Sequence, residues 1–320
     1  MQDTGNKSLT RFEALMLFVA AAATNLLLPY LSALLVRIGI PSGVAQTASA
    51  AVFYAGLVAL PAVLAHKKGD AYGLLRLGAP SIPQVLFTCL IAYFGVRFVT
   101  FLSALWTAFI EMLGGTLPYD SAPVPTSLNG LITSLILSAM VPGVAEELFF
   151  RGAVLRGLEE SEPPKRAIFA CGLLFACLHG SIGGFPAEIC VGCALGYLVY
   201  ITDSLYTAVI CHTLHNTLIL VESYRAGPTA GPSSATMTEA IEAAGGFGAF
   251  IAVTLLMGIV YLYLLRKFGR LFGGERRIAL RTRRGRNPFD LFEMIVAAVC
   301  AVAALCLLVP DLGILAGWFG

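Results

Sequence analysis

Charge is scarce in this chain of 320 residues, of which only 12% are charged and 58% are hydrophobic. Soluble domains carry about 25% charged residues, so this composition excludes an ordinary soluble domain. The mean hydropathy is +0.82, and apolar runs of roughly 20 residues recur along the chain, which is typical of a polytopic membrane protein. The sequence therefore predicts an all-α fold that lies in a lipid bilayer.

Several common signatures are also missing. The sequence contains neither the HExxH motif of zinc proteases nor the GxSxG motif of serine hydrolases. The eight cysteines lie almost wholly inside apolar segments, which favours core packing and excludes a disulfide framework. Cys190 and Cys193 form a CxxC at helical spacing within one of these segments, where packing is again favoured over redox or metal chemistry.

Nine apolar segments predict membrane-spanning helices. The first is too long for the apolar part of a signal peptide and has no clear cleavage site, so it is expected to remain as a span. An arrangement of eight spans, in which one weak segment does not cross, stays open. The predicted spans cover residues 14–36, 44–65, 84–110, 128–157, 166–183, 186–201, 205–222, 247–265 and 291–316. They divide the chain into an N-terminal region of three spans (1–127), a core of four (128–222), and a C-terminal region (223–320) with an outside loop, a span, a basic segment and a last span.

The basic residues predict the orientation of these spans. If the N-terminus is cytoplasmic, two, three, four and nine Lys and Arg residues fall in the four cytoplasmic segments, which is 18 of the 21 in the chain. Only two fall outside, and Arg97 lies within a span. This asymmetry favours a cytoplasmic N-terminus and suits a bacterial inner membrane. The nine basic residues in the segment 266–286 are interpreted as an orientation signal that also contacts anionic lipid head groups. Because this basic segment lies between two predicted spans, no nucleic-acid partner is expected.

Two adjacent glutamates lie inside an apolar span, where an unneeded charge is costly and an ionisable residue indicates a functional site. Glu146 and Glu147 are about 100° apart on a helix, so they face different neighbours. Glu147 precedes Arg151 by four residues, the favourable order for an ion pair. Glu146 is thereby left free. Pro142, just upstream, is expected to kink or open the helix.

Three of the four histidines lie in later apolar segments. Glu146 lies 16 residues before Glu162, in the polar turn, and His179 lies 17 residues after it. Two antiparallel helices of equal length would bring the two side chains to the same depth. His212 and Asn216 share a face of the seventh span at a compatible depth, and His215 lies close in phase to His212. The sequence predicts that these groups meet.

Such a constellation supports several chemistries. A carboxylate can act as general base on a water that His179 also orients, while His212 and Asn216 donate to the oxyanion of a peptide-bond hydrolysis. Alternatively, Glu146, His179 and His212 bind Zn²⁺. A proton-coupled transporter could use Glu146 and His179 as a relay. A non-catalytic scaffold or immunity protein could retain the same core.

The spacing also resembles a known family. Glu146-Glu147-x-x-x-Arg151, Phe175-x-x-x-His179 and His212-x-x-x-Asn216 are similar to the three motifs of the CPBP family, the CAAX-protease and bacteriocin-processing (Abi) intramembrane proteases. Residues 192–196 and 202–205 are similar to the family's link between the second and third motifs. The resemblance covers residues 128–222, under a third of the chain.

The resemblance implies a four-helix catalytic core and a substrate that is a membrane-tethered or lipidated peptide or protein. The eukaryotic branch of the family removes the last three residues of prenylated CAAX proteins. The implied catalytic residues are Glu146, Glu147, His179, His212 and Asn216, with Arg151 and Phe175 as structural support. The family is described both as metalloproteases and as metal-independent glutamate proteases. Because Asn216 is a poor zinc ligand, the second mechanism is favoured and no cofactor is expected, with zinc as the alternative.

Overall fold

The computed structural model describes residues 8–115, 117, 124–227, 236–274 and 276, and within these ranges it contains helices but no strand. Seven long helices are uninterrupted: α1 (Arg11–Arg37), α2 (Ser42–Lys67), α4 (Ile82–Met112), α8 (Pro164–His179), α9 (Phe185–Thr202), α10 (Leu205–Ala226) and α12 (Gly246–Phe272). Two short helices, α3 (Ala71–Leu74) and α11 (Met237–Ala243), lie between them. The predicted all-α fold is confirmed.

One further long helix, residues 128–161, is composite because two π-helical segments interrupt it. It runs through α5 (Leu128–Ser134), η1 (Leu135–Met140), α6 (Val141–Glu147), η2 (Leu148–Val154) and α7 (Leu155–Ser161). We refer to it as the composite helix.

Eight of the predicted spans coincide with these long helices, and the ninth, residues 291–316, lies outside the described residues. Six described helices are long and apolar enough to cross a membrane: α1, α2, α4, the composite helix, α9 and α12. These are the helices of a polytopic membrane protein, while the number of nine spans stays a prediction. The predicted span 166–183 was too long, because α8 ends at His179, where Gly180 adopts a left-handed conformation (φ 66°).

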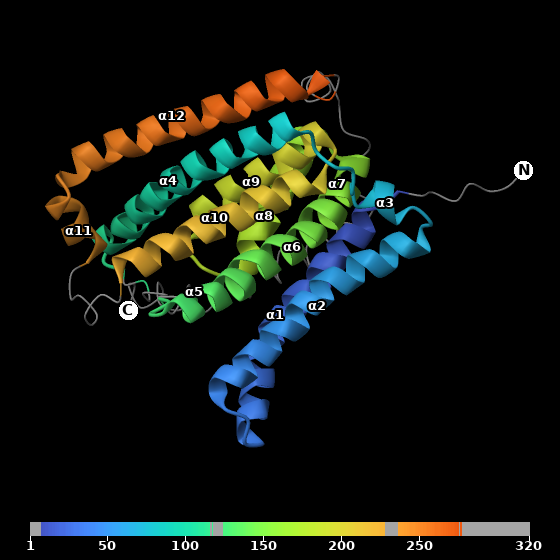
Figure 1. Cartoon of the computed structure of the whole chain (residues 1–320), viewed down its shortest axis with the longest axis horizontal. Helices are drawn as coiled ribbons and strands as arrows, with labels where there is room; N and C mark the ends of the chain where they lie inside the picture. The colour runs from blue at the N-terminus through green and yellow to red at the C-terminus, as the bar shows by residue number, and fades with distance from the viewer. Residues whose placement is uncertain (1–7, 116, 118–123, 228–235, 275, 277–320) are drawn as a thin grey trace, which may run out of the picture.

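The helices pack around a shared apolar core (Figure 1). The α1–α2 hairpin packs against the C-terminal half of the composite helix, with α2 on α6 and η2, and α1 on η2 and α7. Helices α8, α9 and α10 follow, α4 contacts both α9 and α10, and α12 packs along α4. The region 128–222 is therefore covered on both sides by the flanking helices.

Ion pairs gather at one end of the molecule. They join Lys68 to Glu13 (2.9 Å), Arg11 to Glu162 (3.3 Å), Arg76 to Glu159, and Arg276 to Asp203 (2.7 Å). All eight residues lie at or beside the span ends assigned to the cytoplasm. At a connection assigned to the outside, Glu111 accepts hydrogen bonds from the backbone of Met237 and Thr238. The alternation of ends predicted from the basic residues thus agrees with the packing.

Candidate functional site

The two glutamates occupy α6, the short α-helical segment between the two π-helical ones. Pro142 is the second residue of α6, which begins immediately after η1. Proline has no backbone N–H to donate, and single π turns are frequent at functional sites. The opening that the sequence predicts near Pro142 is therefore present as a widened helical turn, and a second one follows the glutamates.

Glu147 lies at the centre of a fully buried network. Its Oε1 accepts hydrogen bonds from Arg151 Nη1 at 2.7 Å and from His212 Nδ1 at 2.8 Å. Arg151 Nη2 donates to the carbonyl of Gly192 at 2.9 Å. Both side chains of the Glu147–Arg151 pair are 0% exposed. The predicted ion pair is confirmed, and it also holds the third-motif histidine.

Glu146 points away from that network toward α8. Its Oε2 lies 3.7 Å from His179 Nε2, which is too long for a direct hydrogen bond and suits a bridging water. This Oε2 is buried and has no hydrogen-bond partner among the described residues. His179 Nδ1 faces the carbonyl of Phe175 at 2.9 Å. Since a carbonyl can only accept, Nδ1 carries a proton, and in its neutral form His179 presents a basic Nε2 to Glu146.

Phe175 separates the two histidines. Its ring centroid lies 4.4 Å from that of His179 and 5.8 Å from that of His212. The guanidinium of Arg151 lies over the same ring, at 4.6 Å from the centroid. The side chain therefore lies between the Glu146 half and the Glu147 half of the site, and its role as structural support stays a prediction.

Asn216 lies one turn beyond His212 on α10, against the π-helical segment η1. Its Nδ2 donates to the carbonyl of Ser138 at 3.4 Å. His215 makes no hydrogen bond or ion pair within the described part of the chain. The structure thus brings Glu146, Glu147, Arg151, Phe175, His179 and His212 into one cluster, with Asn216 at its edge.

Two glycines allow the helices of the site to approach one another. A Cβ at Gly143 would lie 2.3 Å from Thr213 Oγ1 and 3.1 Å from the Thr213 backbone nitrogen, so α6 and α10 touch through this glycine. A Cβ at Gly192 would lie 2.8 Å from the Cα of Gly172, so α8 and α9 touch in the same way. The close packing of Gly192 is therefore a contact between two helices of the same chain.

Two polar residues near Glu146 escaped the sequence analysis. Glu188 on α9 interacts electrostatically with both Glu146 and His179, and its buried Oε2 has no hydrogen-bond partner among the described residues. Tyr54 on α2 also interacts with Glu146. An acidic residue inside a predicted span is a signal that could have identified Glu188. A tyrosine in an apolar helix carries no such signal.

The alternative zinc set is not assembled. Within the described ranges, no three His, Cys, Asp or Glu side chains are grouped so that they could hold one metal ion. Glu146 and His179 face each other, but His212 directs its Nδ1 to Glu147. The residues present therefore do not fit a preformed three-ligand metal site.

The fold and the cluster define a helical membrane protein with a buried carboxylate–histidine site. A protein-family model described as type II CAAX prenyl endopeptidase Rce1-like matches residues 128–218. The match begins at the first residue of the predicted core, includes every motif residue, and confirms the resemblance to the CAAX-protease family. No curated protein and no solved structure matches the chain.

Proposed function

We propose that the protein is an intramembrane endopeptidase that cleaves a membrane-tethered or lipidated substrate, with CAAX-type prenylated peptides as the first candidates. The observation that carries this proposal is the buried Glu146 Oε2, which has no hydrogen-bond partner among the described residues and faces His179 Nε2 at 3.7 Å. Two acceptor atoms at this separation fit one water molecule that donates to both. The family match supports the same class of reaction.

In the proposed reaction, Glu146 is the general base. The water oxygen attacks the scissile carbonyl carbon while its proton passes to Glu146, and the same carboxyl later delivers the proton to the leaving amine. His179 holds the water through Nε2, because its Nδ1 is fixed by the carbonyl of Phe175. These steps need no metal, and we propose a glutamate-type mechanism.

His212 and Asn216 are the proposed donors to the tetrahedral oxyanion. His212 Nδ1 donates to Glu147, so its Nε2 can donate only when the imidazole carries both protons. Glu147 accepts hydrogen bonds from both Arg151 and His212, so this network orients the His212 ring in the site. Asn216 Nδ2 would give up its long hydrogen bond to the Ser138 carbonyl and donate to the oxyanion instead.

A large apolar groove supports a substrate that comes from the lipid. It has a volume of about 1090 Å³ and lies between α2 on one side and η1 and α6 on the other. The groove is lined by Tyr54, which interacts with Glu146, and by Ala145, the residue that precedes Glu146 in the chain. A lipid-modified peptide could therefore rest in the groove with its peptide bond near Glu146.

We further propose that the protein lies in a bacterial inner membrane, with its N-terminus on the cytoplasmic side.

The test is cleavage by the purified protein in lipid, followed by mass spectrometry on a panel of prenylated CAAX peptides and membrane-embedded peptides. Glu146→Ala and a chelator form the two comparison arms. Cleavage that is lost in Glu146→Ala and survives chelation is the expected result. Loss on chelation with recovery on adding Zn²⁺ would contradict the glutamate-type mechanism. No product from any peptide would count against proteolysis and favour the scaffold or the proton-coupled transporter.

A further inference from the structure

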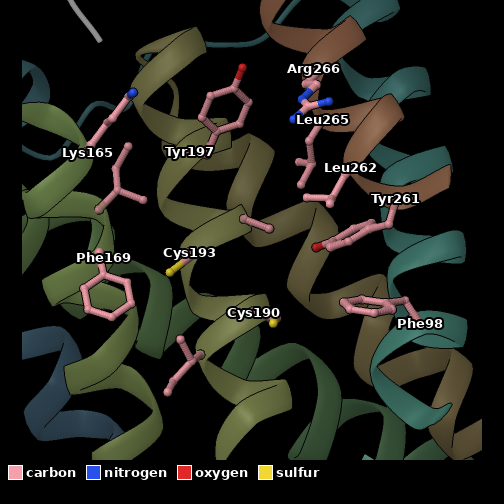
Figure 2. A pocket seen from close by; sticks show the side chains of 13 residues that line it. Phe98, Lys165, Phe169, Cys190, Cys193, Tyr197, Tyr261, Leu262, Leu265 and Arg266 are labelled. Carbon is pink, nitrogen blue, oxygen red and sulfur yellow. The ribbon is translucent and has the colours of Figure 1, made fainter. Parts of the chain in front are cut away.

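A second pocket lies on the opposite side of the core from the groove, between α8 and α9 on one side and α4 and α12 on the other. Figure 2 shows it from close by. Its volume of about 570 Å³ falls within the range of small-molecule sites, which is about 300–1,000 Å³. Apart from its rim, its lining is almost wholly apolar and includes Phe98, Phe169, Cys190, Cys193 and Leu262.

The pocket is polar at one end only. Lys165, at the start of α8, and Arg266, in the last third of α12, stand at the same end as the hydroxyl of Tyr197, whereas Cys190 and Phe98 lie toward the other end (Figure 2). This is the end where the ion pairs gather and where the sequence places the cytoplasm. A long apolar pocket that ends in two cations at the membrane surface has the polarity of a lipid with an anionic head group.

The two cations at the polar end of the pocket have no carboxylate partner among the described residues, whereas several other basic residues at this end do. Lys68, Arg76 and Arg276 each contact a carboxylate. Neither Lys165 nor Arg266 makes an ion pair within the described part of the chain. Both are exposed, so a phosphate could approach them without displacing a partner.

We propose that this pocket binds an anionic phospholipid of the surrounding membrane. One acyl chain lies against Phe169, Cys193 and Leu262, and the phosphate lies between Lys165 and Arg266. A lipid with a net negative charge is preferred over a zwitterionic one, because a choline group would bring a third positive charge to the two cations. The bound lipid joins α12 to the α8–α9 pair of the catalytic core, and the proposal does not depend on proteolysis.

Photo-crosslinking tests the preference. The full-length protein is reconstituted in phosphatidylcholine vesicles with a trace of phosphatidylglycerol or phosphatidylcholine that carries a diazirine on the acyl chain, and labelled peptides are mapped by mass spectrometry. We expect phosphatidylglycerol to label the pocket peptides more than phosphatidylcholine does, by a factor of about five for each of the two cations. This factor corresponds to the attraction between one basic residue and an anionic lipid surface. Lys165→Gln with Arg266→Gln should remove this excess.

The matched control is Lys267→Gln with Arg270→Gln, which removes two positive charges from α12 at residues that do not line the pocket. This variant should keep most of the excess. Equal labelling by the two lipids in the unchanged protein would mean an ordinary lipid contact and overturn the proposal. Absence of pocket labelling would also overturn it, since another part of the chain would then fill the pocket.

Thermal unfolding gives an independent measurement. Phosphatidylglycerol added to the detergent-solubilised protein should raise the unfolding midpoint more than phosphatidylcholine does, because a ligand that binds only the folded state stabilises it. The Lys165→Gln, Arg266→Gln variant should lose the difference between the two lipids. An unchanged difference in that variant would place the lipid preference elsewhere on the protein.

Discussion

Glu146 and Glu147 are adjacent in the chain and both are buried, yet their carboxylates differ in the hydrogen-bond donors that reach them. Glu147 Oε1 accepts from two donors, Arg151 and His212, and only its Oε2 lacks one, whereas Glu146 has no hydrogen-bond donor at all among the described residues. A buried carboxylate oxygen with matched donors already has its hydrogen bonds within the fold. A buried carboxylate that lacks them requires water or substrate. The difference separates a positioning group from a group available for chemistry.

The strongest test of this difference compares Glu146→Gln with Glu147→Gln. Glu146→Gln should lower the rate of peptide cleavage by about 10²–10⁴-fold, the usual contribution of a general base. Its unfolding midpoint should hardly change, because Glu146 makes no hydrogen bond within the described part of the chain. If Glu147→Gln instead had the smaller effect on stability, the assignment of the two roles would be wrong. Rates come from single-turnover cleavage and midpoints from thermal unfolding in the same detergent.

Arg151→Met tests the Glu147 side. The substitution leaves a buried carboxylate without its cation, and breaking a fully buried pair costs about 3–5 kcal/mol of unfolding free energy. The double variant Glu147→Gln, Arg151→Met removes both charges and should recover much of that loss. Denaturant unfolding of the two variants measures this. A similar stability for Arg151→Met and the unchanged protein would show that the pair contributes little.

Asn216→Ala should affect the rate more than the fold. Removal of one oxyanion donor costs about 10²–10³-fold in rate. The hydrogen bond that Asn216 makes to Ser138 is long, at 3.4 Å, so its loss should cost no more than about 1 kcal/mol of unfolding free energy. Asn129→Ala, at an exposed amide of α5, is the control and should leave both quantities unchanged. A full cleavage rate in Asn216→Ala would remove Asn216 from the proposed mechanism.

The sequence predicted the Glu147–Arg151 pair and the approach of Glu146 to His179, because both follow from helical geometry within one helix or one hairpin. The predicted alternation of the span ends agrees with the ion pairs that join several of these ends, while the orientation in the membrane stays a prediction. The sequence did not predict the hydrogen bond between His212 and Glu147, which depends on how α10 is rotated against α6. Glu188 and Tyr54 were missed for the same reason: their proximity to Glu146 is set by the packing of separate helices.

The packing that sets the rotation of α10 can itself be tested at Gly143. A Cβ there would lie 2.3 Å from Thr213 Oγ1 and 3.2 Å from the Thr213 Cα, and backbone atoms cannot move aside as a side chain can. Gly143→Ala should therefore push α10 away from α6 and cost about 1–3 kcal/mol of unfolding free energy through overpacking. His212 and Asn216 move with α10, so the cleavage rate should fall as well.

The matched control is Gly56→Ala in α2, where a Cβ meets nothing within 4 Å. Alanine is the better helix former by about 1 kcal/mol, so this change should be neutral or stabilising. Adding Thr213→Ala to Gly143→Ala removes the closest clash and leaves the backbone contacts, so it should restore stability only in part. If Gly143→Ala cleaved substrate at the normal rate, close contact between α6 and α10 would not be what places His212 and Asn216 beside the two glutamates.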